Sequence, residues 1–447
     1  MRGGAWRCWG ARSSHYNRRM NVIQKMREDW NRRAKSDANY YVAFAGERQD
    51  EEEFLATAAE VVPTLESQFF RLPPASTESR RALDIGCGPG RLMIPMSRHF
   101  GEVHGVDISE EMVALARQKL ARIPNAHVHV NSGSDLRMFD DGYFDLVYSW
   151  IVFQHIPSKE VVLGYLREAQ RVLKPGGILV CQLRGLSPID TELKPGLETW
   201  TGCWFSGEEL VAFALAEKFS LVFLSGLETQ YTVTVFRKRL RSETRPERIV
   251  LKDVTAAKNG EPRIPTRGPD AAVSLWLDGF PDDGDLAEFP VLFGGQFQTG
   301  CFVSPVSEGG GCQLNAVLPH GIQPGIVPVR LSHGGAPVTV SCEIEVFPAP
   351  PRDPKVMRVT DRINPAAHNR IENDGIKVMV QDVEDPAEVS FTVSGRQAGF
   401  VLMDCADPIT STYIFGFPTP RGIKKGPNRL TVRVGRRELE AIEIAIL

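Results

Sequence analysis

The sequence lacks the features that mark a secreted, membrane-spanning or metal-binding protein. Its 447 residues include eight cysteines, but none forms a Cys-x-x-Cys pair or stands at a metal-ligand spacing. No apolar run reaches the ~18 residues that cross a bilayer. Scattered cysteines are typical of a reducing compartment, so we expect a cytoplasmic protein with no membrane span and no metal. Cys301 and Cys312 are more simply interpreted as free thiols than as a disulfide.

The chain also lacks an overall excess of charge of either sign. Its formal net charge is −3, which disfavours a nucleic-acid partner. Basic residues do gather in the first ~40 residues, and no apolar segment follows them as in a secretory signal. We expect residues 1–26 to be a disordered leader. A nucleic-acid arm, or a true start at Met20 or Met26, is the alternative.

Short apolar strands alternate with helical patterns from Arg81 to about residue 240. This alternation predicts an α/β domain of the Rossmann-like, doubly wound kind over residues 27–240, with a core over 81–240 and a helical N-terminal lid over 27–80. The last two strands have no helix between them and should pair antiparallel. We therefore expect a seven-stranded mixed sheet with its last strand antiparallel, its strands at 82–85, 103–107, 126–130, 144–149, 178–183, 220–224 and 230–237.

The character of the chain changes after Lys238, where β-branched runs punctuated by glycine and proline replace helical periodicity. The segment 289–296 resembles 389–397, and 325–331 resembles 426–434, at a spacing of about 100 residues. We expect two copies of an immunoglobulin-like β-sandwich, at 247–347 and 355–447. One long β-domain is the alternative.

A glycine-rich loop follows the first strand of the α/β region, with Gly86, Gly88 and Gly90 at alternate positions. Glycines let a ligand approach the backbone, as in sites for NAD, FAD or S-adenosylmethionine. Asp84, two residues before the first glycine, suits a ligand that carries an ammonium group. Asp107 closes the second strand, where a carboxylate can accept hydrogen bonds from both hydroxyls of a ribose. Asp135 follows the third strand and is placed to contact an adenine ring.

The order of these motifs resembles that of class I S-adenosylmethionine-dependent methyltransferases of the small-molecule type. The resemblance covers residues 81–183 closely and includes Phe144-Asp145-Leu146-Val147 and the run Arg171 to Gly177. It implies S-adenosyl-L-methionine as the cofactor. The residues that it places around the cofactor are Tyr41, Asp84, Gly86, Cys87, Gly88, Gly90, Asp107, Ile108, Met112, Ser134, Asp135, Leu136, Ser149, Trp150 and Ile151.

Two further groups of residues concern the methyl acceptor. His155 follows the fourth strand and is the candidate general base, but its imidazole is more simply interpreted as bracing the loop. The insert 184–205 brings Arg184, Trp200 and Trp204 to the carboxyl ends of the strands, where α/β sheets bind ligands. We interpret these three residues as a substrate pocket, with cover for the core as the alternative.

The sequence thus predicts a methyltransferase whose acceptor is a small molecule or a lipid- or glycan-linked group. The alternative is a cofactor-binding scaffold whose tandem sandwiches carry the main role through contacts with protein or glycan. Methylation of nucleic acid is disfavoured, because no motif for base amines accompanies the basic leader.

Overall fold

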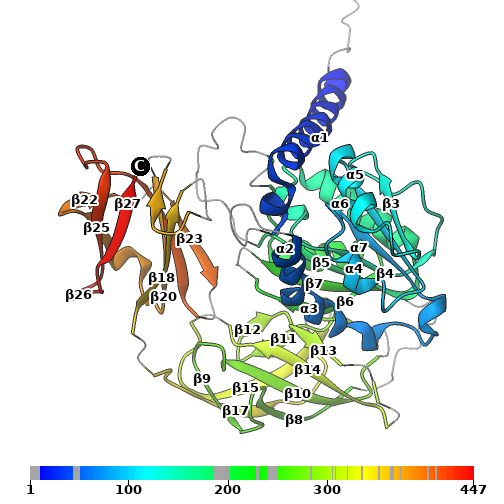
Figure 1. Ribbon diagram of the computed structural model, residues 1–447. Coiled ribbons are helices and arrows are strands. Elements are labelled where there is room, and N and C mark those ends of the chain that lie inside the picture. Colours follow the sequence, from blue (N-terminus) through cyan, green and yellow to red (C-terminus); the bar gives the residue numbers. More distant parts are fainter. Residues whose placement is uncertain are drawn as a thin grey trace, which may run out of the picture. The chain divides into compact units, whose positions relative to one another are not determined.

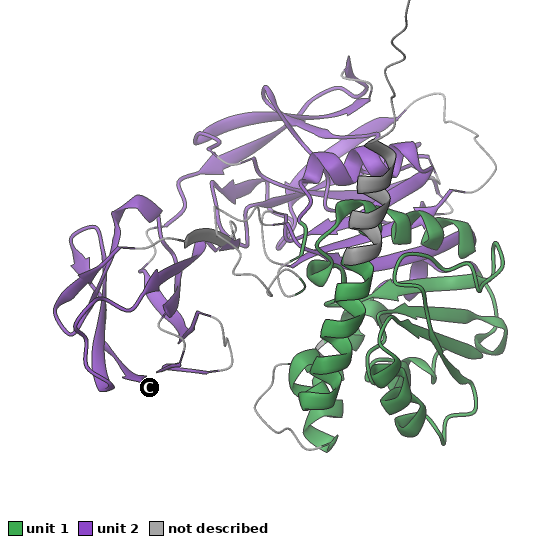
Figure 2. Cartoon of the chain, turned by 90° about the horizontal axis from the view of Figure 1, so that it is seen from above, with its two compact units in different colours: residues 1–67, 74–172, 193–203 green, residues 68–73, 173–192, 204–447 purple. Residues whose placement is uncertain are grey.

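The computed structural model describes residues 11–43, 51–185, 199, 202–227, 231–239, 249–281, 284–304, 306–307, 309–319, 321–333, 336–350, 353–362, 367–372, 375–399, 402–407 and 410–447. The chain divides into two compact units (Figure 2). The first comprises residues 1–67, 74–172 and 193–203, and the second comprises 68–73, 173–192 and 204–447. Each unit is described by itself.

The first unit is built on a parallel sheet with the strand order β3-β2-β1-β4. Its outer strands β3 and β4 are labelled in Figure 1. Every residue of β4 is buried, and so is every residue but the first of β1 and β2, as expected for a parallel sheet. The carboxyl ends of the strands therefore open on one edge, where the glycine-rich loop lies. The strands are β1 (Arg81–Ile85), β2 (Glu102–Asp107), β3 (Ala126–Val130) and β4 (Phe144–Ser149).

The helices of this unit are shorter and more broken than the sequence predicts. Pro95 lies within α4, which is a single turn, and Pro63 stands at the start of α3, so the predicted helical lid over 27–80 is interrupted. The helical segments are α1 (Ala11–Ala43), α2 (Glu51–Ala56), η1 (Thr57–Glu60), α3 (Val62–Glu66), η3 (Thr77–Ser79), α4 (Met93–Met96), α5 (Glu110–Lys119), η4 (Phe153–His155) and α6 (Lys159–Val172).

Helix α1 crosses the expected boundary between a leader and the domain. The helix begins at Ala11, and the Met26 side chain is only 3% exposed. The division at residue 26 therefore falls inside one helix, all of which belongs to the first unit. None of the described helices is long and apolar enough to cross a membrane.

The second unit begins with three strands and one helix of the predicted α/β pattern. Strand β7 pairs antiparallel with both β5 and β6, as predicted for the last two strands. Strand β5 starts directly after α6, five residues earlier than expected. The elements are η2 (Phe69–Arg71), β5 (Leu173–Leu183), α7 (Gly207–Ala216), β6 (Phe219–Ser225) and β7 (Thr232–Lys238).

The remainder of the second unit consists of strands that follow one pairing scheme twice. In one sheet of each set, β8-β10-β14-β13 corresponds to β18-β20-β24-β23. In the other, β9-β17-β15-β11-β12 corresponds to β19-β27-β25-β21-β22, and the β9–β17 and β19–β27 pairs are both parallel. The strands of the first set are β8 (Val250–Ala256), β9 (Arg263–Pro265), β10 (Ala272–Asp278), β11 (Val291–Phe293), β12 (Gln296–Gln298), β13 (Phe302–Val303), β14 (Gly311–Val317), β15 (Gly325–His333), β16 (Ala336–Pro337) and β17 (Cys342–Phe347).

The second set repeats irregular details as well as strand order. A β-bulge skips Lys252 in β8 opposite β10, and another skips Met357 in β18 opposite β20. The second set comprises β18 (Lys355–Asp361), β19 (Arg370–Ile371), β20 (Gly375–Gln381), η5 (Pro386–Glu388), β21 (Val389–Val393), β22 (Arg396–Ala398), β23 (Leu402–Asp407), β24 (Thr412–Pro418), β25 (Gly426–Val434), β26 (Arg437–Glu438) and β27 (Ile442–Ile446).

The first set is joined to the strands before it by backbone pairing. Strand β13 pairs antiparallel with β6 through Phe302 and Phe223, so the β5-β7-β6 sheet continues into the first set. Cys301 and Cys312 are free thiols. Among the described residues, no group of three or more His, Cys, Asp or Glu side chains could hold a metal ion.

Substitution of Phe391 tests whether the second strand set has a shared core. Its ring is fully buried and packs against Phe415 and Phe417, with ring centroids 5.2 and 4.8 Å away. We expect Phe391→Ala to lower the free energy of unfolding by about 3–5 kcal/mol. Met357→Ala, at a residue that is 50% exposed, is the matched control and should change it by less than about 0.5 kcal/mol. Denaturant titration followed by circular dichroism measures both; equal effects would contradict a shared core at Phe391.

Candidate functional site

The glycine-rich loop has the backbone geometry that only glycine accommodates well. Gly86, Gly88 and Gly90 have φ of +76°, +53° and +85°. A Cβ at Gly86 would lie 2.5 Å from the side chain of Val152. The Gly86 and Cys87 N–H groups donate to the carbonyl oxygen of Val106, at 2.8 and 3.1 Å, and tie the loop to β2. The loop thus brings bare backbone to the end of two strands.

Asp107 is the residue that fastens the loop to the next helix. Its Oδ2 accepts from the Gly88 N–H and its Oδ1 from the Ser109 N–H, both at 2.9 Å. Ser109 in turn caps α5 by accepting from the Met112 N–H at 3.1 Å. Burial nevertheless raises the pKa of Asp107 to about 6, because it outweighs these backbone hydrogen bonds.

Asp84 is a second buried carboxyl group beside the loop. Burial, helped by the nearby charge of Asp107, raises its pKa to about 8, although Arg91 and the Tyr148 hydroxyl favour its ionised form. The side chain is only 3% exposed. Two ionised carboxyl groups in one buried site raise the free energy of the ligand-free protein, and a cationic ligand would lower it.

The second half of α1 is bent over this region. Asp37 has non-helical φ and ψ of −166° and 89°, and its carboxylate accepts from the Tyr40 N–H at 3.0 Å, so a new helical segment starts there. Asn31 anchors the helix, since its Oδ1 accepts from the Ser109 hydroxyl at 2.6 Å. Ala34 and Ala38 pack against Met112 of α5. These contacts bring Tyr41 to the site.

The end of β4 carries a strained residue. Ile151 has φ of +56°, an uncommon conformation for a β-branched side chain, which costs about 1–3 kcal/mol. On one side, the Ser149 hydroxyl donates to the Ile85 carbonyl at 2.9 Å, and on the other Val152 packs on Gly86. The backbone is therefore fixed on both sides of Ile151, beside the loop.

These elements enclose a cavity with about 700 Å³ of empty space, part of which is open to solvent. Its walls are mostly apolar and aromatic, with a few polar groups, as is typical of small-molecule sites. The lining residues are Met26, Trp30, Tyr41, Val42, Ile85, Gly86, Gly88, Val106, Asp107, Ile108, Met112, Asn131, Trp150, Ile151, Val152, Ile156 and Tyr165.

The structure thus brings together at one cavity most of the residues that the sequence predicts around a cofactor. Tyr41, Gly86, Gly88, Asp107, Ile108, Met112, Trp150 and Ile151 line it. Asp84, Cys87, Gly90 and Ser149 are buried next to these residues but do not line it.

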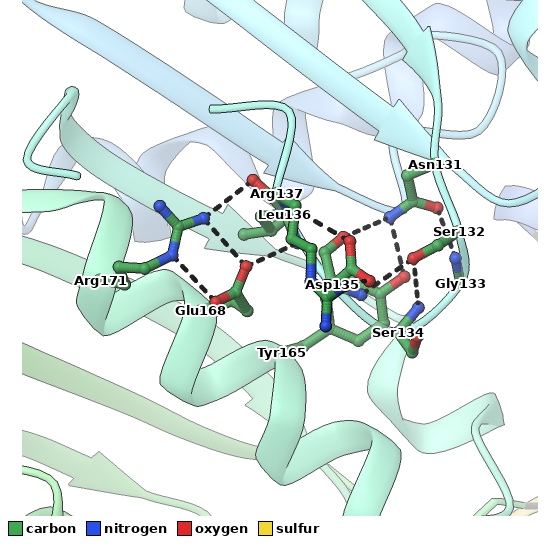
Figure 3. A network of polar contacts seen from close by, with 10 residues as sticks. All are labelled: Asn131, Ser132, Gly133, Ser134, Asp135, Leu136, Arg137, Tyr165, Glu168 and Arg171. Carbon is green, nitrogen blue, oxygen red and sulfur yellow. Dashed lines mark hydrogen bonds and ion pairs between the residues drawn. The ribbon is translucent and has the colours of Figure 1, made fainter. Parts of the chain in front are cut away.

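Ser134, Asp135 and Leu136 lie on the loop after β3 but do not line the cavity. A polar network holds this loop on α6 (Figure 3). The Leu136 N–H donates to Glu168 Oε2 at 3.0 Å, and Arg171 holds the same carboxylate through two hydrogen bonds of 2.9 Å. The Leu136 N–H is therefore already satisfied within the protein.

Asn131 and Tyr165, rather than Asp135, reach the cavity from this network. Asn131 Nδ2 donates to the Tyr165 hydroxyl at 2.8 Å, and Asn131 Oδ1 accepts from the Gly133 N–H at 3.2 Å (Figure 3). An amide and a phenol at this position can exchange hydrogen bonds with the edge of a heterocycle.

His155 is 4% exposed and is not among the lining residues. Its ring packs edge-on against Trp30 at 5.5 Å between centroids, and its Nε2 lies 3.3 Å from Gln154 Nε2. Trp30 does line the cavity, so His155 supports one wall from behind. These contacts match the bracing role that the sequence left open beside catalysis.

The predicted substrate pocket stays a prediction, because its residues are not described together within one unit. Arg184 and Trp204 belong to the second unit, whereas every lining residue of the cavity belongs to the first. Trp200 lies outside the described residues.

Sequence reasoning missed Met26, Trp30, Asn131 and Tyr165. Met26 and Trp30 stand four residues apart, so they share one face of a helix, and this spacing is a usable signal. Asn131 directly follows β3, where ligand-facing residues of such sheets gather. Tyr165 has no such signal, because it is one of several apolar positions on α6.

Comparison with known proteins agrees with this geometry. Residues 82–177 match the model of a family described as a methyltransferase domain. A demethylmenaquinone methyltransferase from Staphylococcus aureus is 36% identical over 104 residues, which are 23% of this chain and 42% of that protein. The chain therefore spans less than half the length of this curated relative.

Solved structures with partial similarity include two from other organisms. The geranyl diphosphate C-methyltransferase of Streptomyces coelicolor A3(2) is 16% identical with a TM-score of 0.36, covering 48% of this chain and 97% of that chain. The PH0226 protein of Pyrococcus horikoshii is 20% identical with a TM-score of 0.35, covering 45% and 98%.

The glycine loop, its two carboxyl groups and the matched segment lead to one assignment. Residues 82–177 are similar to a methyltransferase domain, and the cofactor of such a domain is S-adenosylmethionine.

Proposed function

We propose that the protein transfers a methyl group from S-adenosylmethionine to a small molecule or to a lipid- or glycan-linked acceptor. The observation that carries the proposal is Asp107, which lines the cavity while its two oxygens accept from Gly88 and Ser109. A carboxylate held in this way has lone pairs left for the two hydroxyls of a ribose.

The remaining cofactor residues fit a nucleoside that bears an amino acid. We propose that Gly86, Cys87, Gly88 and Gly90 form the methionine end, where the glycines expose backbone. Asp84, buried next to the cavity lining, would balance the ammonium group, and its cost of burial favours a cation. We propose that Ile108 and Met112, with Asn131 and Tyr165, form the adenine side, and that the loop of Ser134, Asp135 and Leu136 supports it from outside the cavity. Tyr41, Trp150 and Ile151 would surround the reacting end, with Ser149 buried beside them.

When bound, the cofactor supplies a methyl group that its sulfonium already activates. The residues of the chain therefore act mainly by positioning the acceptor and excluding water. The apolar wall from α1, with Met26, Trp30 and Tyr41, supports an acceptor with an apolar part. We further propose that Arg184, Trp200 and Trp204 contact this acceptor.

The architecture extends the proposal to the rest of the chain. We propose that the two equivalent strand sets are immunoglobulin-like sandwiches, at 247–347 and 355–447, and that β1 to β7 form one doubly wound domain within 27–240. The matching strand orders and the hydrophobic core of the second set support the assignment of the strand sets as sandwiches.

The six cysteines that the structure describes are free thiols, which supports a cytoplasmic location.

Substitution of Asp107 tests the cofactor site. Asp107→Asn removes the charge that would accept the ribose hydroxyls, and hydrogen bonds to charged groups contribute about 1.5–3 kcal/mol each. We expect roughly 100-fold weaker binding of S-adenosylhomocysteine by calorimetry and a matching loss of methyl transfer to fractionated cell extract. Asp140→Asn, at an exposed carboxylate of the same unit, is the control. Undiminished binding by Asp107→Asn would refute the proposed site.

The pKa values of Asp84 and Asp107 predict how cofactor binding depends on pH. Burial raises them from 3.8 to about 8 and about 6, so the ligand-free protein loses stability as pH rises from about 4 to about 8. A ligand ammonium group would offset this loss. We expect the rise in melting temperature with saturating S-adenosylhomocysteine to be larger at pH 8.5 than at pH 6. In Asp84→Asn this difference should shrink; an unchanged difference would contradict the role of Asp84.

Substitution of His155 distinguishes a bracing role of this residue from a role in proton transfer. Because His155 packs behind Trp30, we expect His155→Ala to weaken cofactor binding severalfold and to lower the melting temperature. The shape of the kcat profile against pH should stay the same. If His155 were a general base, its removal would instead lower kcat by about 100-fold or more, and the acidic limb of the profile would disappear. His127→Ala, at an exposed histidine of β3, is the control.

A further inference from the structure

The outer face of the sheet β8-β10-β14 combines an exposed indole with polar side chains. On this face, each β10 residue has one neighbour on β8 and one on β14. Trp276 lies between Asp253 of β8 and Gln313 of β14, and Ser274 lies between Thr255 of β8 and Asn315 of β14. These six residues are called the Trp276 face. The opposite face of the same strands carries the buried residues Val273, Leu275 and Leu277, which belong to the core.

Trp276 is held in place although it faces solvent. Its side chain is 43% exposed, which is unusual for a large aromatic residue in the middle of a strand. The indole Nε1 donates to the Thr255 hydroxyl at 3.1 Å, so the polar edge of the ring is satisfied by the protein. What remains for a ligand is the flat apolar surface of a ring whose orientation is fixed.

The neighbouring amides are oriented by a small network. Gln313 Nε2 donates to Ser274 Oγ and to Asn315 Oδ1, both at 2.9 Å, and Ser274 Oγ donates to Asn315 Oδ1 at 2.8 Å. Among the described residues, Asn315 Nδ2 and Gln313 Oε1 have no partner. The network thus presents one fixed donor group and one fixed acceptor beside the indole. The exposed carboxylate of Asp253 lies on the other side of Trp276.

The second strand set provides an internal comparison. When the two sets are aligned on their shared bulge, Trp276 and Asp253 of the first set correspond to Met379 and Arg358 of the second. The pairing of β20 with β24 likewise makes Ile414 the counterpart of Gln313. The second set therefore has no indole, amide or carboxylate at these positions. Since both sets share the strand scheme, folding alone does not require the Trp276 face.

The charges around the face favour an uncharged ligand. Lys252, the cation nearest to it on β8, is ion-paired with Asp278. Asp253 adds negative charge, which would repel an acidic group. A ligand for this face must therefore have a flat apolar surface and a rim of groups that both donate and accept hydrogen bonds, without a negative charge.

We propose that the Trp276 face binds a neutral saccharide. A pyranose ring has one face of C–H groups, which can stack on the indole, and a rim of hydroxyls, which can donate to Gln313 Oε1 or Asp253 and accept from Asn315 Nδ2. This binding is separate from the methyltransferase cavity and does not depend on the function proposed for it.

Affinity electrophoresis of the full-length protein tests the proposal. Native gels would contain hydroxyethyl cellulose, galactomannan, yeast mannan or soluble starch, all of them neutral polysaccharides. We expect at least one of the four to retard the protein. In that gel, Trp276→Ala and Asn315→Leu should raise the apparent dissociation constant at least tenfold, and Trp276→Phe should retain part of the binding. Met379→Ala, at the equivalent position of the second set, should behave as the wild type.

Two results would overturn the proposal. One is unaltered mobility of the wild-type protein in all four gels, as expected if the face instead contacts a protein. The other is retardation that persists in Trp276→Ala. Because Trp276 is exposed, the melting temperature of the variant should stay within a few degrees of the wild type, so a loss of binding would not reflect unfolding. Binding of S-adenosylhomocysteine should be unchanged in every variant of the face.

Discussion

The arrangement of the cavity depends on one carboxylate, Asp107, at the end of β2. It accepts one backbone N–H from the glycine loop and one from the start of α5. The Ser109 hydroxyl links that start to Asn31 of α1. Asp107 and Ser109, which only Ile108 separates, thus join three segments that are far apart in the sequence. A buried carboxylate with a raised pKa costs stability when it is ionised, as expected for a group that serves a ligand rather than the fold.

The parts of the site that the sequence predicts are those encoded locally. Gly86, Gly88 and Asp107 follow from the strand–loop–helix spacing, because the positive φ values and the hydrogen bonds of the loop are short-range features. The contribution of α1 could not be predicted in the same way. It depends on a bend at Asp37 and on packing against Met112, which is about 80 residues away in the sequence.

The loop after β3 shows a different limit of prediction. Its position was expected correctly, but a sequence motif does not give the direction of each side chain. Asn131 and Tyr165 line the cavity, whereas the backbone of Leu136 is held by Glu168 and Arg171. The duplication in the C-terminal half was visible through its glycine-containing hairpins. Strands β8 and β18 give no comparable signal, because polar and bulged residues interrupt their alternation.

The pairing of β13 with β6 has a consequence for dividing the chain. Strand β6 has β7 on one side and β13 on the other, with the Leu224 N–H donating to the Cys301 carbonyl at 2.8 Å. A fragment ending near residue 240 would leave this border of β6 as a bare row of backbone donors and acceptors. Open borders of this kind recruit strands from other molecules. The first strand set therefore serves its neighbour as a permanent cover, so the junction between them is part of the fold rather than a simple linker.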